Sequence, residues 1–196
     1  ARKNFDENIT REALEMIETR ELEGEFKSTV LFKEDWHKGV IGIVASRCIE
    51  KYYRPTIILT ESNNKATGSA RSVYDFNIYE AIEECSDLLE QFGGHKYAAG
   101  LTLSVANVPA FQAKFESVVS NRVSEIHMKP ILEIDDELIL DQINYRFYNI
   151  LKQMTPFGPG NPEPVFCANQ VFAENVRVLK DKHLRFDIIQ DGQSKI

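Results

Sequence analysis

The sequence lacks several features that would define a class of protein at once. It contains no apolar run near the ~18 residues that a membrane span needs, and no basic-then-apolar leader of a secreted protein. The three cysteines, Cys48, Cys85 and Cys167, are odd in number, far apart and outside any CxxC pair, which argues against a zinc site or a disulfide framework. We therefore expect free thiols in a cytoplasmic protein that has no contact with a membrane.

Motifs of complete catalytic sites are also missing. The sequence has no HExxH, no Walker loop, no Ser/His/Asp order, and no carboxylates and histidines at metal-ligand spacing. His127 and His183 have no partner pattern, and the acidic run at 135–137 is most simply a solvated strand edge. We expect neither a complete hydrolytic site nor a bound metal in this chain.

The charge balance is acidic, with 23 basic and 30 acidic residues and a formal net charge of −7. Proteins that bind nucleic acid without regard to sequence usually carry a basic footprint, so strong non-specific binding to duplex DNA is not expected. Residues 25–60 nevertheless hold more bases than acids, which leaves room for a local anion-binding patch.

Hydrophobic periodicity predicts a mixed α/β fold for the first two thirds of the chain. A strand, a helix and a strand between residues 27 and 60 form a βαβ pattern, which favours a largely parallel sheet with flanking helices. The helix that begins after Asn77 is expected to run to Phe92. The pattern predicts strands at 27–33, 56–60, 66–72 and 99–104, with helices at 10–21, 41–53, 77–92 and from 107 onward.

After residue 130 the pattern changes to a short helix and several short strands. The helix begins at Asp141 and should bury Ile143, Ile150 and Met154, and a segment rich in proline and glycine follows at 156–164. Alternating strands then predict a small antiparallel β-domain that this chain leaves incomplete. The expected divisions are 1–24, a linker helix from a missing domain; 25–122, the α/β domain; and 130–196, the β-domain.

Gly93-Gly94-His95 is the first candidate binding motif. Glycine adopts positive φ without penalty, so consecutive N–H groups can turn toward one anion, and a neighbouring histidine adds a directional donor. An ordinary turn beside a structural histidine explains the same residues, so both interpretations stay open.

Ser69-Ala70-Arg71-Ser72 is the second candidate. On a strand, Ser69 and Arg71 point to one face, where a guanidinium can bind phosphate at two points and the hydroxyl adds a donor. The alternative is a surface arginine on an edge strand. Arg47, on the polar side of the helix at 41–53, is either a further phosphate contact or a solvated residue.

Five motifs, in order and at matching spacing, resemble the C-terminal part of the RecJ family of bacterial single-stranded-DNA-specific exonucleases. They are Trp36–Arg47 (WHKGVIGIVASR), Tyr53-Arg54-Pro55, Gly68–Ser72 (GSARS), Phe92–Gly100 (FGGHKYAAG) and Pro156–Pro164 (PFGPGNPEP). Five motifs in sequence are far more specific than any single one.

The resemblance implies a DHH-associated domain at about 25–122 and the start of an OB-fold domain at about 130–196. Members of that family use an N-terminal DHH phosphoesterase domain, with two Mn²⁺ or Mg²⁺ ions, to hydrolyse single-stranded DNA from its 5′ end in recombination and repair. Those metal ligands are missing from this chain, so we expect it to hold substrate and to be inactive alone. The OB-fold is expected to guide the upstream single strand.

The resemblance also assigns phosphate binding to two motifs, Gly93-Gly94-His95 and Ser69-Ala70-Arg71-Ser72. With Arg47 added, the predicted phosphate-binding residues are Ser69, Arg71, Ser72, Gly93, Gly94, His95 and Arg47. The expected partners are single-stranded DNA and single-strand-binding or other repair proteins. Two alternatives stay open: a binding module without chemistry, and a DHH-family phosphodiesterase that acts on short oligonucleotides or cyclic dinucleotides.

Overall fold

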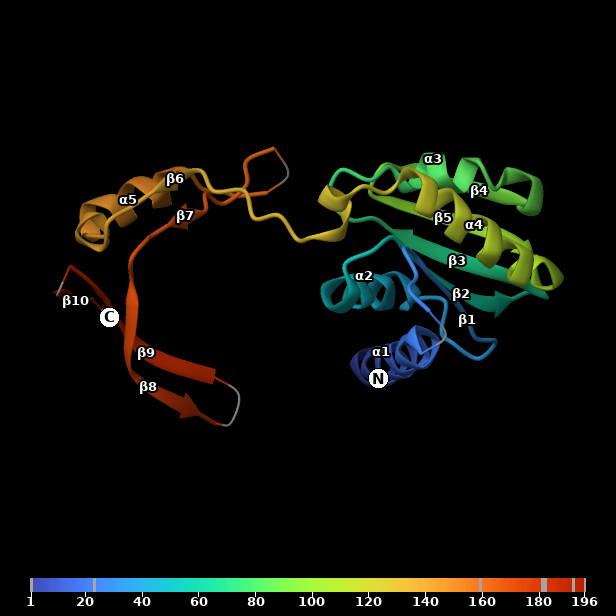
Figure 1. Cartoon of the computed structure of the whole chain (residues 1–196), viewed down its shortest axis with the longest axis horizontal. Coiled ribbons are helices and arrows are strands. Elements are labelled where there is room, and N and C mark those ends of the chain that lie inside the picture. The colour runs from blue at the N-terminus through green and yellow to red at the C-terminus, as the bar shows by residue number, and fades with distance from the viewer. Residues whose placement is uncertain (1, 23, 159, 181–182, 192, 196) are drawn as a thin grey trace. The chain divides into compact units, whose positions relative to one another are not determined.

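The computed structural model describes residues 2–22, 24–158, 160–180, 183–191 and 193–195. The chain divides into two compact units, residues 1–131 and 132–196 (Figure 1). The prediction that residues 1–24 link to a preceding domain stays a prediction.

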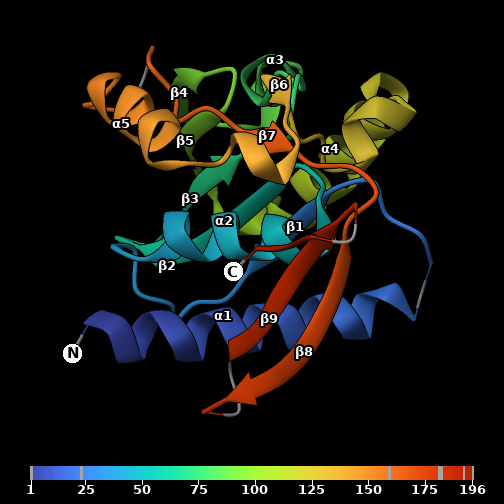
Figure 2. The same ribbon diagram turned by 90° about the vertical axis from the view of Figure 1, so that its left-hand side faces the viewer.

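The first unit is a five-stranded sheet between two layers of helices. Helices α3 and α4 lie on one side of the sheet, and α1 and α2 lie side by side on the other (Figures 1 and 2). Its elements are α1 (Arg2–Glu21), β1 (Thr29–Phe32), α2 (Ile41–Tyr52), β2 (Thr56–Ser62), β3 (Lys65–Arg71), α3 (Ile78–Glu83), β4 (Gln91–His95), β5 (Ala98–Ser104) and α4 (Val108–Arg122), with short 3-10 helices at Ser86–Leu88, Val105–Asn107 and Glu125–Met128.

Each helical layer has its own hydrophobic core. Phe111 and Phe115 of α4 pack with Leu103 and other residues on one face of the sheet, whereas α1 and α2 pack against Leu31 and Ile58 on the opposite face. Trp36 is buried in this second core, and its Nε1 donates to Glu12 Oε2 of α1 at 2.9 Å. Trp36 therefore anchors α1 to this core.

The mixed α/β class is confirmed, but the expectation of a largely parallel sheet is wrong. The strand order is β1-β2-β3-β5-β4, and within it the parallel pairing is that of β1 with β2, the pair joined by α2. The other three pairings are antiparallel. Asn63 and Asn64, with φ of 55° and 60°, form the tight turn between β2 and β3, a geometry that reverses the chain within two residues.

The helix predicted at 77–92 is also shorter than expected. Asn77 caps it as predicted, since its side chain accepts from the backbone N of Glu80, but α3 ends at Glu83. Leu88, Leu89 and Phe92 still pack against the α3/α4 core, from a 3-10 turn and from β4. Their helical spacing therefore reflects contact with one core and not one continuous helix.

The described part of the second unit contains short sheets, the helix α5 and a 3-10 helix. Its elements are a 3-10 helix at Leu140–Gln142, β6 (Asp136–Glu137), α5 (Tyr145–Gln153), β7 (Phe166–Cys167), β8 (Phe172–Leu179), β9 (His183–Gln190) and β10 (Gln193–Lys195). Strands β8, β9 and β10 form the predicted antiparallel sheet, and β6 pairs with β7 in parallel.

The predicted burial around α5 is wrong within the described part of this unit. Ile143, Ile150 and Met154 are about half exposed, at 52%, 51% and 46%. A unit of this size exposes much of its surface, so an apolar helix face is not necessarily covered.

None of the described helices combines the length and the apolar character needed to cross a membrane.

Candidate nucleic-acid interface

Part of the sheet in the first unit carries no helical cover. Helix α1 packs near β1, and α2 contacts both β2 and β3; beyond these helices, the same face of β3, β5 and β4 presents small or polar residues. Gly93, His95 and Gly100 are exposed there, and Ser69 and Arg71 are half-buried. We call this surface the open face.

The register of the sheet brings the two candidate motifs together on the open face. Residues directly opposite each other on antiparallel strands have their side chains on the same face. Three rows therefore cross β3, β5 and β4 in order: Arg71–Ala98–His95, Ser69–Gly100–Gly93 and Thr67–Thr102–Gln91. Ser69, Arg71, Gly93 and His95, predicted from separate motifs, form one surface.

Arg71 is held against the start of α2. Its Nη1 donates to Ser69 Oγ at 3.0 Å and to the carbonyl oxygen of Ala70 at 2.8 Å. A Cβ at Gly42 would lie 2.8 Å from Nη2, so glycine at position 42 makes room for the guanidinium. Val40, which precedes α2, has no polar side chain to cap the helix, so the partial positive charge of the helix start adds to that of Arg71.

No ion pair engages Arg71 among the residues that the structure describes. Its guanidinium therefore keeps donors for an external anion, and a planar guanidinium can bind phosphate at two points. Ser69, which receives one of its hydrogen bonds, fixes the direction of the side chain.

His95 presents a donor to solvent. Its Nδ1 accepts from the backbone N of Tyr97 at 3.3 Å, so the neutral ring carries its proton on Nε2. The residue is exposed at the end of β4. An imidazole whose Nδ1 accepts this bond has Nε2 available to donate to a phosphate oxygen.

The glycines at the site differ in what they permit. Gly94 has φ of +152°, and a Cβ there would lie 2.3 Å from the carbonyl oxygen of Ala98, so the hairpin itself requires glycine. A Cβ at Gly93 would meet nothing within 4 Å, and one at Gly100 would meet only the carbonyl oxygen of Gly68 at 3.9 Å. Neither Gly93 nor Gly100 has positive φ. Gly94 is therefore required by the hairpin, whereas Gly93 and Gly100 leave their part of the row Ser69–Gly100–Gly93 without side chains.

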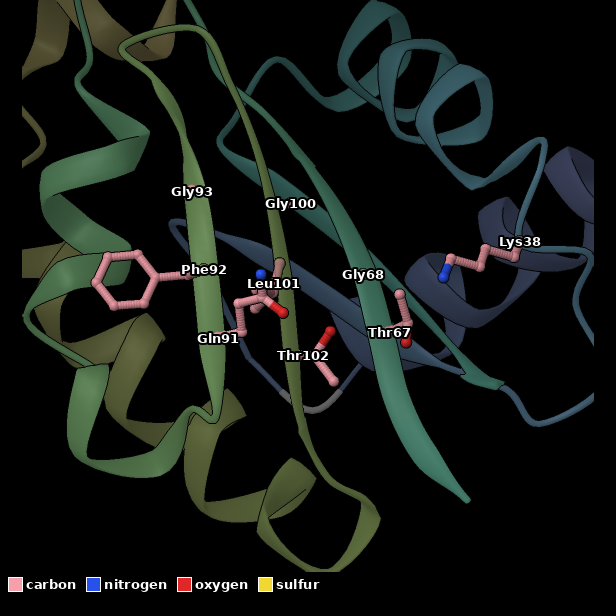
Figure 3. A pocket seen from close by; sticks show the side chains of 9 residues that line it. All are labelled: Lys38, Thr67, Gly68, Gln91, Phe92, Gly93, Gly100, Leu101 and Thr102. Atoms are coloured by element: carbon pink, nitrogen blue, oxygen red, sulfur yellow. The ribbon is translucent and has the colours of Figure 1, made fainter. Parts of the chain in front are cut away.

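A shallow pocket of about 400 Å³ lies on this part of the sheet (Figure 3). Lys38, in the loop before α2, extends over it toward the side of Thr67. The pocket is lined by Lys38, Thr67, Gly68, Gln91, Phe92, Gly93, Gly100, Leu101 and Thr102. Sequence reasoning missed Lys38, Thr67 and Thr102; the alternation of β3 and β5 is the signal that places the two threonines beside Ser69 and Gly100.

Arg47 and Ser72 have other contacts. Arg47 Nη2 lies 2.7 Å from Asp6 Oδ2, an ion pair between α2 and α1. Ser72 Oγ donates to the carbonyl oxygen of Phe76 at 2.6 Å, which uses its only proton within a turn. The phosphate roles predicted for Arg47 and Ser72 stay predictions.

The described residues offer no metal centre. No group of three or more histidine, cysteine, aspartate or glutamate side chains in the described part of the chain is arranged to hold a metal ion. The chemical capacity of the open face is therefore to bind and orient an anion, with donors from Arg71, His95 and Lys38 around a glycine floor.

In comparisons with known proteins, a different family model matches each of the two compact units of the chain. Residues 25–121 match the family model described as the DHHA1 domain, and residues 134–196 match the RecJ OB domain. The single-stranded-DNA-specific exonuclease RecJ of Bacillus subtilis is 35% identical over 180 residues, which cover 91% of this chain and 23% of that protein. The RecJ of Escherichia coli is 27% identical, over 94% of this chain and 33% of that protein.

A solved structure is similar across both units. The crystal structure of RecJ in complex with Mn²⁺ from Thermus thermophilus matches with a TM-score of 0.78 and 31% identity, over 98% of this chain and 28% of that one. The chain thus spans about a quarter to a third of the length of these relatives. On these two domain matches and these similarities, the chain belongs to the RecJ family, in the region formed by the DHHA1 and RecJ OB domains.

Proposed function

We propose that this chain is the substrate-binding region of a single-stranded-DNA-specific exonuclease that acts from the 5′ end of the strand in recombination and repair. The names of the relatives support the substrate class and the reaction. The observation that carries the proposal is the row Arg71–Ala98–His95, in which two donors with no carboxylate partner among the described residues lie on either side of Ala98, beside the bare row Ser69–Gly100–Gly93.

In this function Arg71 and His95 bind one backbone phosphate of the DNA. Arg71 supplies charge and two-point geometry, Ser69 and Gly42 hold its guanidinium in place, and His95 donates from Nε2. Holding the phosphate in a fixed position lowers the entropy cost of the reaction. The open face therefore acts by orientation, and His95 is a substrate-positioning residue, not a catalytic base.

We assign the metal chemistry to another part of the protein. A divalent metal would activate water and stabilise charge at the phosphate. Relatives have been solved with Mg²⁺ and with Mn²⁺, whereas the described residues here form no metal-binding group. The second unit, with its OB-domain match, is proposed to bind the upstream single strand, which is also where repair proteins would meet the complex.

The test compares Arg71→Ala and His95→Ala with a matched control, Arg122→Ala. Arg122 lies on α4, on the other side of the sheet, and pairs with Glu80 and Glu84. Fluorescence anisotropy with a short single-stranded oligodeoxynucleotide should show about 10- to 100-fold weaker binding for the two site variants, the range expected for a lost charge-assisted hydrogen bond. The control should bind as the unaltered chain does.

Activity distinguishes this function from its alternatives. In the full-length protein with Mn²⁺, Arg71→Ala and His95→Ala should slow exonuclease turnover, and the 196-residue chain alone should release no nucleotides. Wild-type turnover in both variants would contradict the phosphate assignment. Cleavage of cyclic dinucleotides in preference to single strands would favour a small-nucleotide phosphodiesterase. A full-length protein that binds single-stranded DNA but has no nuclease activity would favour a pure binding module.

A further inference from the structure

The pocket beside the proposed phosphate site points to a second contact with the same strand. We propose that Lys38 and the row Thr67–Thr102 bind a second phosphate of the DNA backbone, two linkages from the first, with the stretch of strand between the two phosphates lying on Gly93 and Gly100. This inference rests on the proposed function, because it extends the strand that Arg71 and His95 hold.

The charge of Lys38 is available for such a contact. Other lysines around the sheet are engaged: Lys33 pairs with Glu12, Lys65 with Glu90 and Lys96 with Asp75. Within the described residues no carboxylate pairs with Lys38, which is exposed and lines the pocket. The acidic residues closest in sequence to the rows that contain Thr67 and Arg71 are Glu90 and Asp75. Each forms an ion pair with a lysine, which partly neutralises its charge.

The geometry suits an extended strand. Thr67 and Arg71 are four residues apart on one face of β3, about 13 Å at ~3.3 Å per residue, with the Ser69–Gly100–Gly93 row between them. Thr67 and Thr102 face each other in the register and add two hydroxyl donors, and the side chain of Lys38 points toward the Thr67 side of this pair (Figure 3). Donors therefore lie at both ends of a bare floor.

The floor itself supports a ligand. Neither side-chain packing nor backbone conformation within this unit demands glycine at 93 or 100, since a Cβ at Gly93 meets no atom within 4 Å, one at Gly100 makes only an ordinary contact at 3.9 Å, and φ is not positive at either. The remaining physical reason is close approach by something outside the unit. A sugar–phosphate backbone satisfies this condition and also explains the donors at the two ends, which a segment of another protein would not require.

The experiment combines Lys38→Met with a single neutral linkage in the DNA. An oligodeoxynucleotide series carries one methylphosphonate at each linkage in turn, and binding to this chain is measured by anisotropy at several salt concentrations. We expect Lys38→Met to weaken binding about tenfold and to reduce the slope of log K against log salt by about 0.7, the value for one phosphate of a single strand. Lys114→Met, on α4 and paired with Asp87, should change neither quantity.

The decisive result is a loss of additivity. At one linkage the methylphosphonate should weaken binding to the unaltered chain but not weaken binding to Lys38→Met any further. Additive effects at every linkage, or an unchanged salt slope, would overturn the second contact. Since Lys38 is exposed, an unchanged thermal midpoint verifies that the variant folds.

The two proposals fail in different ways. If Arg71→Ala and His95→Ala weaken binding while Lys38→Met does not, only the second phosphate contact is wrong. If none of the three variants changes affinity or salt slope, the proposed function of the open face is wrong as well.

Discussion

Arg71 and His95 each lie directly opposite Ala98 in the sheet, Arg71 from β3 and His95 from β4. Their backbones are therefore about 10 Å apart, two inter-strand spacings, with only a methyl group between them. The guanidinium stays over β3, where Ser69 and the start of α2 hold it, so a phosphate above Ala98 would lie between the two donors. The separation is set by the sheet and not by a flexible loop.

The adjacent glycines Gly93 and Gly94 should respond differently to alanine. Gly94→Ala places a Cβ 2.3 Å from the carbonyl oxygen of Ala98 at φ +152°, and should lower the free energy of unfolding by about 1–3 kcal/mol. Gly93→Ala meets no atom within 4 Å and should leave stability unchanged or slightly raised. Urea unfolding measures both.

DNA affinity should fall for Gly93→Ala, the variant whose stability is expected not to fall. Gly93→Ala should bind the oligodeoxynucleotide more weakly although it folds normally, because its methyl group occupies the floor. An affinity equal to that of the unaltered chain would show that the strand does not approach Gly93.

Gly42→Ala should disturb the site without unfolding the protein. The new Cβ would lie 2.8 Å from Arg71 Nη2 and 3.0 Å from Ser69 Oγ, and a flexible side-chain end can move away. Alanine favours helix over glycine by about 1 kcal/mol, so the thermal midpoint should not fall. DNA affinity should fall several-fold; if it does not, the position of the guanidinium is not important for binding.

Acid should loosen the contact between α1 and the sheet. Hydrogen bonds from Lys33, and then from Trp36, lower the pKa of Glu12 below its ordinary value of 4.5. As the pH falls, the unfolded chain takes up this proton first, so the stabilisation is present above pH 4.5 and is lost as pH falls through the lowered pKa.

The fluorescence of Trp36, the one tryptophan in the sequence, reports this unfolding directly. Glu12→Gln should reduce the acid-induced loss of stability, whereas Glu7→Gln, an exposed change on the same helix, should not. Equal acid dependence in both variants would exclude Glu12 as the group responsible.

The three cysteines should differ in reactivity. Burial raises the pKa of Cys48 and of Cys85 to about 11, so neither forms appreciable thiolate at neutral pH. Cys167 is only half-buried. A thiol-reactive dye should therefore label one site rapidly in the native chain and all three after denaturation, and Cys167→Ser should abolish the rapid phase. Rapid labelling of Cys48 or Cys85 would contradict the buried positions.

Much of the first unit follows from local sequence patterns. The run Ile57–Leu59 and the alternation around Ser69 and Arg71 predict β2 and β3 because burial repeats every one or two residues there. The mostly antiparallel pairing of the strands was missed because the βαβ pattern describes β1 and β2 alone. The turn at Asn63 and Asn64 contained the missing signal, since two residues that tolerate positive φ between strands favour a hairpin.

The site was predictable only in pieces. Alternation places Ser69 and Arg71 on one face, but their position beside His95 depends on how β3, β5 and β4 align, which no single segment encodes. Lys38 lies in a loop, where periodicity gives no information. Arg47 lies on the polar side of its helix as expected, and its partner Asp6 comes from α1, an element whose docking the local pattern does not reveal.

The open face is built from strands that are neighbours along the chain as well as in space. Strands β4 and β5 join through a hairpin, and α3, a 3-10 turn and β4 separate β3 from its partner β5 along the chain, so no long irregular loop must close before the three rows exist. Chains with such local contacts fold quickly. We therefore expect the glycine floor to form early, and Arg71 to reach its final position only when α2, with Gly42 at its start, docks on the sheet.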